Sequence, residues 1–146
     1  MLALIQRVSQ AQVEVAGQRV GAIHGGLLAL VGIEPGDGDA QVARMCERLL
    51  GYRVFADGDG RMNRSLADTR GGLLLVSQFT LAADTSSGMR PGFSTAAVPA
   101  EAERIFAKLV RTCREKHPPG VETGQFGAHM TVSLVNDGPV TFLLRA

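Results

Sequence analysis

The stretch Val132-Ser-Leu-Val-Asn-Asp-Gly138-Pro139-Val-Thr-Phe-Leu-Leu144 places four turn-forming residues between two apolar runs. Apolar runs bounded in this way are typical of two β-strands joined by a turn. Pro139 has no backbone N–H and Gly138 tolerates almost any φ, so the chain can change direction between them. From these residues alone a trans bond is favoured, because only about 5–6% of X-Pro bonds in folded proteins are cis. The stretch therefore predicts strand, turn and strand.

A second apolar strand ends in polar groups, in Leu73-Leu-Leu-Val-Ser77-Gln78-Phe79-Thr80-Leu81-Ala82-Ala83-Asp84. The hydroxyls of Ser77 and Thr80 are the obvious nucleophile candidates. Neither has a base evident in the sequence, and no G-x-S-x-G elbow is present. Hydrogen bonding at the strand end is therefore favoured for both hydroxyls, with Thr80 as an acyl nucleophile kept as an alternative.

Length and composition favour one ordinary globular domain. The chain has 146 residues and 45% apolar content, which suffices for a single core over residues 1–146. The net charge of +1 indicates that any RNA contact is local and small. The first seven residues do not resemble a signal peptide, and no apolar run approaches a bilayer span. With only two cysteines, the protein is expected to be soluble, reduced and cytoplasmic, with no membrane or DNA partner.

The remaining patterns predict an α+β fold. Its sheet should be strand-rich, mixed or antiparallel, and barrel- or sandwich-like, with two covering helices. Amphipathic spacing predicts helices over about 39–51 and from Pro99 to the Pro118 region, and the acidic end of the preceding loop is expected to cap the first. Strands are expected at 2–9, 11–15, 19–23, 27–33, 53–55, 122–126, 130–136 and 140–145 in addition to the apolar strand above. The breaker-rich segment 84–93 is expected to be a functional loop.

One metal motif has to be weighed. Asp57, Asp59 and Asp68 stand at positions 1, 3 and 12 of a possible calcium loop. The fifth position is Arg61 instead of an oxygen ligand, and the sixth is Met62 instead of glycine. A hairpin turn is the better interpretation.

The catalytic inventory is otherwise short. His24, His117 and His129 share no motif, and each is interpreted as incidental. Cys46 and Cys113 fall on the apolar faces of the two expected helices, which favours buried core thiols. No metal-ligand spacing is present, so neither a metal site nor a cofactor is predicted.

The two stretches SQFTLAAD and NDGPVTF together resemble the signature motifs of the D-aminoacyl-tRNA deacylases, also called D-tyrosyl-tRNA deacylases. Further matches lie in the same order along the chain, at Leu4–Val8, Cys46–Arg53, Arg61–Asn63 and Gly88–Pro91. The resemblance covers the whole chain, and two correctly spaced multi-residue motifs are far more specific than an isolated dipeptide.

The resemblance implies hydrolysis of the ester that joins a D-amino acid to the terminal ribose of tRNA, releasing free tRNA and the D-amino acid. It implies a catalytic set of Ser77, Gln78, Phe79 and Thr80. Backbone N–H groups at Phe79–Ala82 are suitable oxyanion donors, and Thr80 or Gln78 is expected to hold the ribose or the water. In the family the chemistry relies on a hydroxyl of the RNA itself, so no strong protein nucleophile is needed.

For chiral selection, the resemblance implies a cis Gly138–Pro139 bond that reaches the active site of the other subunit of a homodimer. Its carbonyls would face the α-amino group, so an L side chain would be driven into backbone. Arg7 matches the position that braces this turn, and the substrate-binding set also includes Leu81, Ala82 and Asn136. Glycine has no side chain to exclude, so glycyl-tRNA, including glycine mischarged on tRNA-Ala, is an expected substrate. A module that binds the tRNA acceptor end without hydrolysis remains an alternative.

Overall fold

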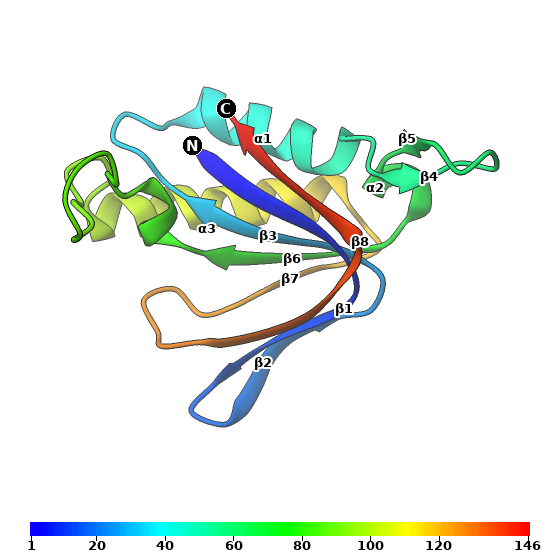
Figure 1. The fold of residues 1–146 in the computed structure, drawn as a ribbon, viewed down its shortest axis with the longest axis horizontal. Coiled ribbons are helices and arrows are strands. Elements are labelled where there is room, and N and C mark those ends of the chain that lie inside the picture. The colour runs from blue at the N-terminus through cyan, green and yellow to red at the C-terminus, as the bar shows by residue number, and fades with distance from the viewer.

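The computed structural model describes residues 1–146 and confirms the α+β class with a mixed, nearly barrel-shaped sheet (Figure 1). Its strands run in the order β2-β1-β3-β6-β7, and β8 also pairs with β1. β1 is antiparallel to β2, β3 and β8, whereas β6 is parallel to both β3 and β7. The strands are β1 (Leu2–Val15), β2 (Gln18–Ile23), β3 (Gly26–Gly32), β6 (Gly72–Ser77), β7 (Val121–Thr123) and β8 (Thr131–Arg145).

The two central strands β3 and β6 are buried on both faces, which explains their unbroken apolar runs. Successive side chains of a strand point to opposite faces. Leu27 and Ala29 accordingly join a cluster of 24 buried residues on one face, whereas Leu28 joins a cluster of seven on the other. The sheet therefore separates two apolar cores of unequal size.

Two long helices cover the larger core, as the amphipathic patterns predict (Figure 1). They are α1 (Asp39–Gly51) and α3 (Pro99–Lys116), and the whole apolar stripe of α3 is buried. A third helix, α2 (Leu66–Thr69), was not expected; it is a single turn in which Ser65 and Asp68 form a capping box. None of the helices combines the length and apolar character needed to cross a bilayer.

The Asp57 segment is a hairpin turn between β4 (Phe55–Ala56) and β5 (Met62–Arg64), as interpreted from the sequence. The Asp57 carboxylate accepts hydrogen bonds from the amides of Asp59 and Arg61 and from the Asn63 side chain. These hydrogen bonds, with Asn63 the largest contributor, hold the pKa of Asp57 below its ordinary value.

Some element boundaries differ from those expected. β1 is one continuous strand instead of two, and β8 runs through the Gly138–Pro139 turn because register shifts opposite β1 absorb the kink. Strand β7 ends at Thr123, short of the predicted Phe126. The helix cap was predicted wrongly: Gly38 is the N-cap of α1 and its amide donates to the Gln41 side chain.

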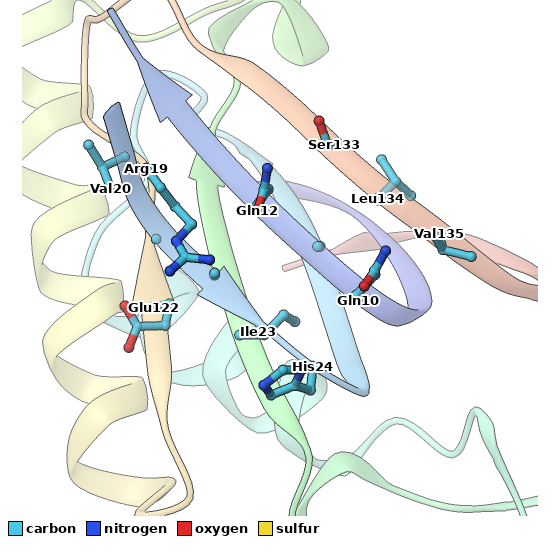
Figure 2. Close-up of a pocket in the computed structure, with 13 residues that line it drawn as sticks. Gln10, Gln12, Arg19, Val20, Ile23, His24, Glu122, Ser133, Leu134 and Val135 are labelled. Atoms are coloured by element: carbon cyan, nitrogen blue, oxygen red, sulfur yellow. The ribbon is translucent and has the colours of Figure 1, made fainter. Parts of the chain in front are cut away.

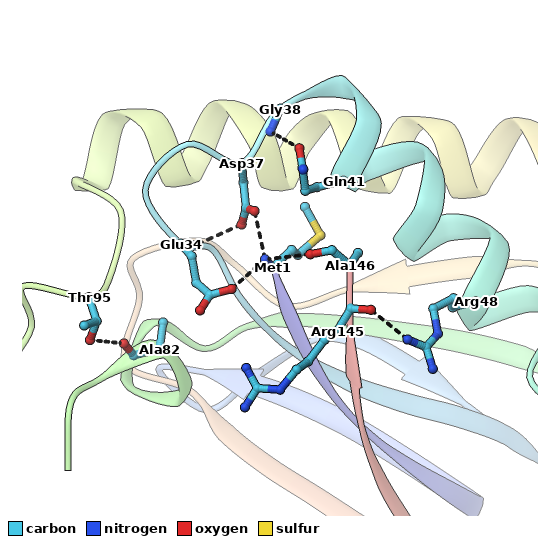
Figure 3. Close-up of polar contacts among 10 residues, drawn as sticks. All are labelled: Met1, Glu34, Asp37, Gly38, Gln41, Arg48, Ala82, Thr95, Arg145 and Ala146. Atoms are coloured by element: carbon cyan, nitrogen blue, oxygen red, sulfur yellow. Dashed lines mark hydrogen bonds and ion pairs between the residues drawn. The ribbon is translucent and has the colours of Figure 1, made fainter. Parts of the chain in front are cut away.

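The first and last residues lie side by side because β1 pairs with β8 (Figures 1 and 3). The buried Met1 ammonium contacts Glu34 at 2.7 Å and Asp37 at 2.8 Å. The amide of Ala146 donates to the Met1 carbonyl oxygen at 3.0 Å. The end of the β1–β8 pair that carries both chain termini is thus fixed against the loop that precedes α1.

Candidate functional site

The signature segment leaves the sheet at the end of β6. Ser77 is the last residue of the strand and pairs with Val31, and the Gln78 amide donates to the Val31 carbonyl oxygen at 2.8 Å. The chain then forms a single 3₁₀ turn, η1 (Phe79–Ala82). The chain therefore changes direction immediately after the last hydrogen bond between β3 and β6, which places the polar residues at the edge of the sheet.

Two adjacent backbone donors of this turn are free. The amide of Leu81 donates to Gln78 and that of Ala83 donates to Thr80, both at 3.2 Å. The N–H groups of Phe79 and Thr80, the first two residues of the turn, have no acceptor within it. Unpaired backbone N–H groups held by a fixed scaffold can stabilise an oxyanion that forms beside them.

The hydroxyl of Thr80 is oriented by its neighbour. Gln78 Nε2 donates a hydrogen bond to Thr80 Oγ1, so the hydroxyl proton of Thr80 remains available for an external acceptor. Neither Thr80 nor Ser77 is hydrogen-bonded to a carboxylate or an imidazole that could act as a base. The geometry suits Thr80 to holding a ligand better than to attacking it.

A pocket of about 660 Å³ opens beside this segment. Of the four residues predicted to be catalytic, Ser77, Gln78 and Phe79 line it, and Thr80 lies next to it in the turn. Apart from Val76, the other lining residues come from segments 93–102 and 126–132, of which only Phe93 lies in the loop expected to be functional. They include Phe93, Ala97, Val98, Phe126, His129, Met130 and Val132. A mostly apolar cleft with a few polar groups at one end is typical of a small-ligand site.

The loop after η1 leads to Phe93, which lines the pocket. Asp84 and Gly92 exchange backbone hydrogen bonds of 2.8 and 2.9 Å, which join the two ends of the loop. Within it, hydrogen bonds from Ser86 hold the pKa of Asp84 below its ordinary value. The ring centroids of Phe79 and Phe93 lie 5.3 Å apart. Phe79 is 59% exposed and Phe93 is 48% exposed. Two solvent-facing aromatic rings at a pocket mouth can stack on a planar ligand group.

The Gly138–Pro139 turn is the second signature element, and its peptide bond is cis in the structure. Arg7 donates from Nε to the Asp137 carbonyl oxygen at 3.0 Å and from Nη1 to the Val54 carbonyl oxygen at 2.7 Å. The position predicted from the resemblance to brace the turn thus contacts the residue that precedes it.

Asn136 holds the other side of the same turn. Its Nδ2 donates to the carbonyl oxygens of Arg7 at 2.9 Å and of Val140 at 3.1 Å. Gly138 has φ of 143°, and a Cβ atom there would lie 2.6 Å from Val140 Cγ2, so only glycine fits. The conformation of the turn is therefore held by its own neighbours.

The two signature elements lie far apart within one chain. Gly138 and Pro139 sit opposite the Arg7 position of β1, which pairs with Leu27 at the start of β3. Ser77 pairs with Val31, four residues further along β3, or about 13 Å at 3.3 Å per residue. Neither residue of the turn lines the pocket beside Ser77. The turn and the Ser77 segment therefore do not share a pocket within one chain.

Another hollow of about 680 Å³ lies across β1, β2, β7 and β8 (Figure 2). Its polar lining includes Gln10, Gln12, Arg19, Glu122 and Ser133. None of the residues predicted for the site lines it. The geometry therefore favours the Ser77 pocket as the functional one.

The histidines and cysteines also have defined positions. His117 is buried with Nε2 2.7 Å from the Gly71 carbonyl oxygen, whereas His129 lines the Ser77 pocket and had been interpreted as incidental. Cys46 and Cys113 are buried in the larger core, as predicted. The neighbouring Cys46 thiol and burial raise the pKa of Cys113. No three His, Cys, Asp or Glu side chains form a group that could hold a metal ion.

Comparison with known proteins gives a consistent picture. A family model described as D-Tyr-tRNA(Tyr) deacylase matches residues 4–145. The chain is 75% identical over 145 residues to the D-aminoacyl-tRNA deacylase of Stenotrophomonas maltophilia (strain K279a), covering 99% of each protein. It is 74% identical, with the same coverage, to that of Xanthomonas axonopodis pv. citri (strain 306).

Two solved structures share the fold. The c-Myc DNA Unwinding Element Binding Protein superposes with a TM-score of 0.95 at 36% sequence identity, covering 100% of this chain and 99% of the other. A probable eukaryotic D-amino acid tRNA deacylase superposes with a TM-score of 0.85 at 14% identity, covering 99% and 98%. The second likeness bears on the fold alone.

Proposed function

The chain belongs to the D-Tyr-tRNA(Tyr) deacylase family and is a hydrolase that deacylates D-aminoacyl-tRNA, and we propose that its active site combines two copies of the chain. One copy supplies the Ser77–Ala82 segment and the second supplies the Gly138–Pro139 turn. The observation that carries this proposal is the separation of the two elements within one chain, across β3 and outside a common pocket.

The reaction is ester hydrolysis by positioned water. Water adds to the ester carbonyl carbon, the tetrahedral oxyanion receives hydrogen bonds from the free N–H groups of Phe79 and Thr80, and the ribose oxygen leaves with a proton. Thr80, oriented by Gln78, donates a hydrogen bond to the ribose or to the attacking water and keeps its proton. A ribose hydroxyl next to the ester completes the proton transfer, so the chain needs no base of its own. The apolar cleft around Phe79 and Phe93 accommodates the terminal base.

Chirality is read by the turn of the second copy. Its carbonyl groups accept hydrogen bonds from the protonated α-amino group, which every aminoacyl ester shares. With the amino group and the ester both fixed, a D side chain points to solvent and an L side chain meets the backbone of the turn. Glycyl-tRNA, including glycine on tRNA-Ala, has no side chain to exclude and is hydrolysed as well.

An exposed apolar surface supports assembly into a homodimer. β8 pairs only with β1, so its outer edge is free, and Val135, Phe142 and Leu143 on this strand are exposed by 48%, 36% and 46%. A free edge strand with large apolar side chains is normally covered by another chain. A twofold contact through β8 would carry each turn towards the other copy.

The proposal is tested with D- and L-tyrosyl-tRNA labelled in the amino acid. The protein should release label from the D-ester and leave the L-ester intact, and it should hydrolyse glycyl-tRNA. Sedimentation at the assay concentration should give a dimer, and specific activity should fall on dilution below the dimer dissociation constant. Full activity of a monomer would contradict the two-copy site, and equal release from both esters would contradict selection by the turn.

A further inference from the structure

Gly32, the last residue of β3, lies directly against the η1 turn. A Cβ atom at this position would lie 3.2 Å from the Ala82 amide nitrogen, 3.2 Å from the Gln78 carbonyl oxygen and 3.3 Å from Leu81 Cβ. Two of these three atoms belong to the backbone, so no side-chain rotation can make room for it. The absence of a side chain at residue 32 therefore sets how closely the turn sits on the sheet.

The opposite side of the turn is held by a hydrogen bond from outside the signature motif. Thr95 Oγ1 donates to the Ala82 carbonyl oxygen at 2.6 Å (Figure 3). The segment that carries Thr95 is itself anchored to the sheet, because the Ala97 amide donates to the Ile33 carbonyl oxygen at 3.0 Å. The turn is thus confined between β3 and the 95–97 segment.

We propose that Gly32 and Thr95 are positioning residues for deacylation, which together fix the Phe79 and Thr80 N–H groups at the site of the reacting carbonyl. Neither residue lines the Ser77 pocket, so both act through the turn. The inference rests on the proposed function, since it assigns those N–H groups to the oxyanion.

The expected effect is on rate. Groups that stabilise a transition state must lie within about 0.5 Å of the productive position, and a misplacement of about 1 Å can reduce a rate about 100-fold. A methyl group at residue 32 forces the turn outward by a few tenths of an ångström. Gly32→Ala should therefore reduce kcat several-fold while KM and the D/L ratio change little.

The experiment measures kcat, KM and the D/L ratio on tyrosyl-tRNA, together with the unfolding temperature, for wild type, Gly32→Ala and Gly51→Ala. Gly51 is a matched control because a Cβ atom there meets no atom within 4 Å. A loss of kcat confined to Gly32→Ala supports the proposal. Wild-type kcat in a folded Gly32→Ala variant overturns it, whereas a wild-type protein without D-specific activity would instead refute the proposed function.

A second pair of variants, at Thr95, tests the same positioning role if Gly32→Ala does not fold. Thr95→Val removes the hydroxyl at nearly constant shape and should reduce kcat several-fold, and Thr95→Ser keeps the donor and should restore it. A role limited to stability would lower the unfolding temperature in Thr95→Val without changing kcat of the folded enzyme. Equal kcat for Val and Ser at residue 95 would overturn the proposal.

Discussion

Arg7 and Asp137 are separated by 130 positions in the sequence and are joined by a hydrogen bond of 3.0 Å from Arg7 Nε to the Asp137 carbonyl oxygen. The same guanidinium contacts the Asp137 carboxylate at 3.4 Å and the Val54 carbonyl oxygen at 2.7 Å. One side chain thus ties the Gly138–Pro139 turn to β1 and to the segment before the β4–β5 hairpin.

Arg7→Lys should weaken chiral selection while leaving the fold intact. Lysine has a single ammonium group and cannot reproduce the fork of donors that Arg7 uses. A hydrogen bond from a charged donor contributes about 1.5–3 kcal/mol, so the D-specific rate should fall about tenfold and the D/L ratio should shrink. The measurement is the initial rate on D- and L-tyrosyl-tRNA, with Arg19→Lys as an exposed strand control. An unchanged D/L ratio would show that Arg7 does not hold the turn.

Mixing two impaired variants should raise activity above that of either variant alone if the site is shared between copies. In a hybrid dimer of Arg7→Ala and Thr80→Ala, one site carries both defects and the other carries neither. Subunit exchange should therefore recover D-specific hydrolysis to a level set by the hybrid fraction. The control is each variant mixed with itself. No recovery, despite hybrids detected by native mass spectrometry, would assign each turn to its own chain.

Thr80→Ala should slow the reaction without abolishing it, because Thr80 orients a group and does not attack. Loss of one such donor typically costs about 100- to 1,000-fold in kcat. Thr80→Ser keeps the hydroxyl and should retain most of the activity. Mass spectrometry of an acid-quenched wild-type reaction should find no acylated protein, and an aminoacyl ester on Thr80 would restore the nucleophile alternative.

The two cysteines should be dispensable for catalysis. Both are buried in the larger core, and the raised pKa of Cys113 keeps its thiol protonated at neutral pH. Neither should react with an aromatic disulfide reagent until the protein is unfolded, and Cys113→Ala should lose stability by about 1–3 kcal/mol while keeping its rate. Rapid labelling of the folded protein, accompanied by loss of activity, would contradict this prediction.

Acid should loosen the loop at Asp84. Hydrogen bonds from Ser86 favour its carboxylate, so the folded pKa lies below the ordinary 3.8. The stabilisation is therefore complete above about pH 4 and is lost as the pH falls through the folded pKa. The Ser86 amide proton, followed by NMR, should titrate with a midpoint below 3.8 in wild type and not at all in Asp84→Asn. A midpoint at or above 3.8 would argue against this hydrogen bond.

The fold was largely predictable because its main elements carry strong patterns. The apolar stripes of α1 and α3 repeat at helical spacing, and the unbroken run in β3 indicated a strand buried on both faces. The N-cap was not predictable, because Asp39 instead pairs with Lys108, which is 69 positions away. The capping preferences of individual residue types carry no information about such a distant partner.

Beyond the signature residues, the sequence indicated only that segment 84–93, which ends at Phe93, is a functional loop. Phe93 and His129 come from segments without periodicity, and the cleft forms only when those segments meet β6. Gly32 and Thr95 gave no signal either, because a close backbone approach and a single side-chain hydrogen bond leave no pattern in sequence. The cleft and these two contacts both depend on how segments distant in sequence come together in the folded chain.

The pairing of β1 with β8 has a consequence for when the enzyme becomes selective. Residues 2–14 find their partners only among residues 131–145, so the most remote parts of the chain must meet before this pairing exists. Contacts of such sequence separation form late and make folding slow. On a translating ribosome, the helices and central strands can assemble while the Gly138–Pro139 turn has not yet emerged. The discrimination between mirror-image esters that we propose for this turn would therefore be acquired last, in the closing step of the protein's own synthesis.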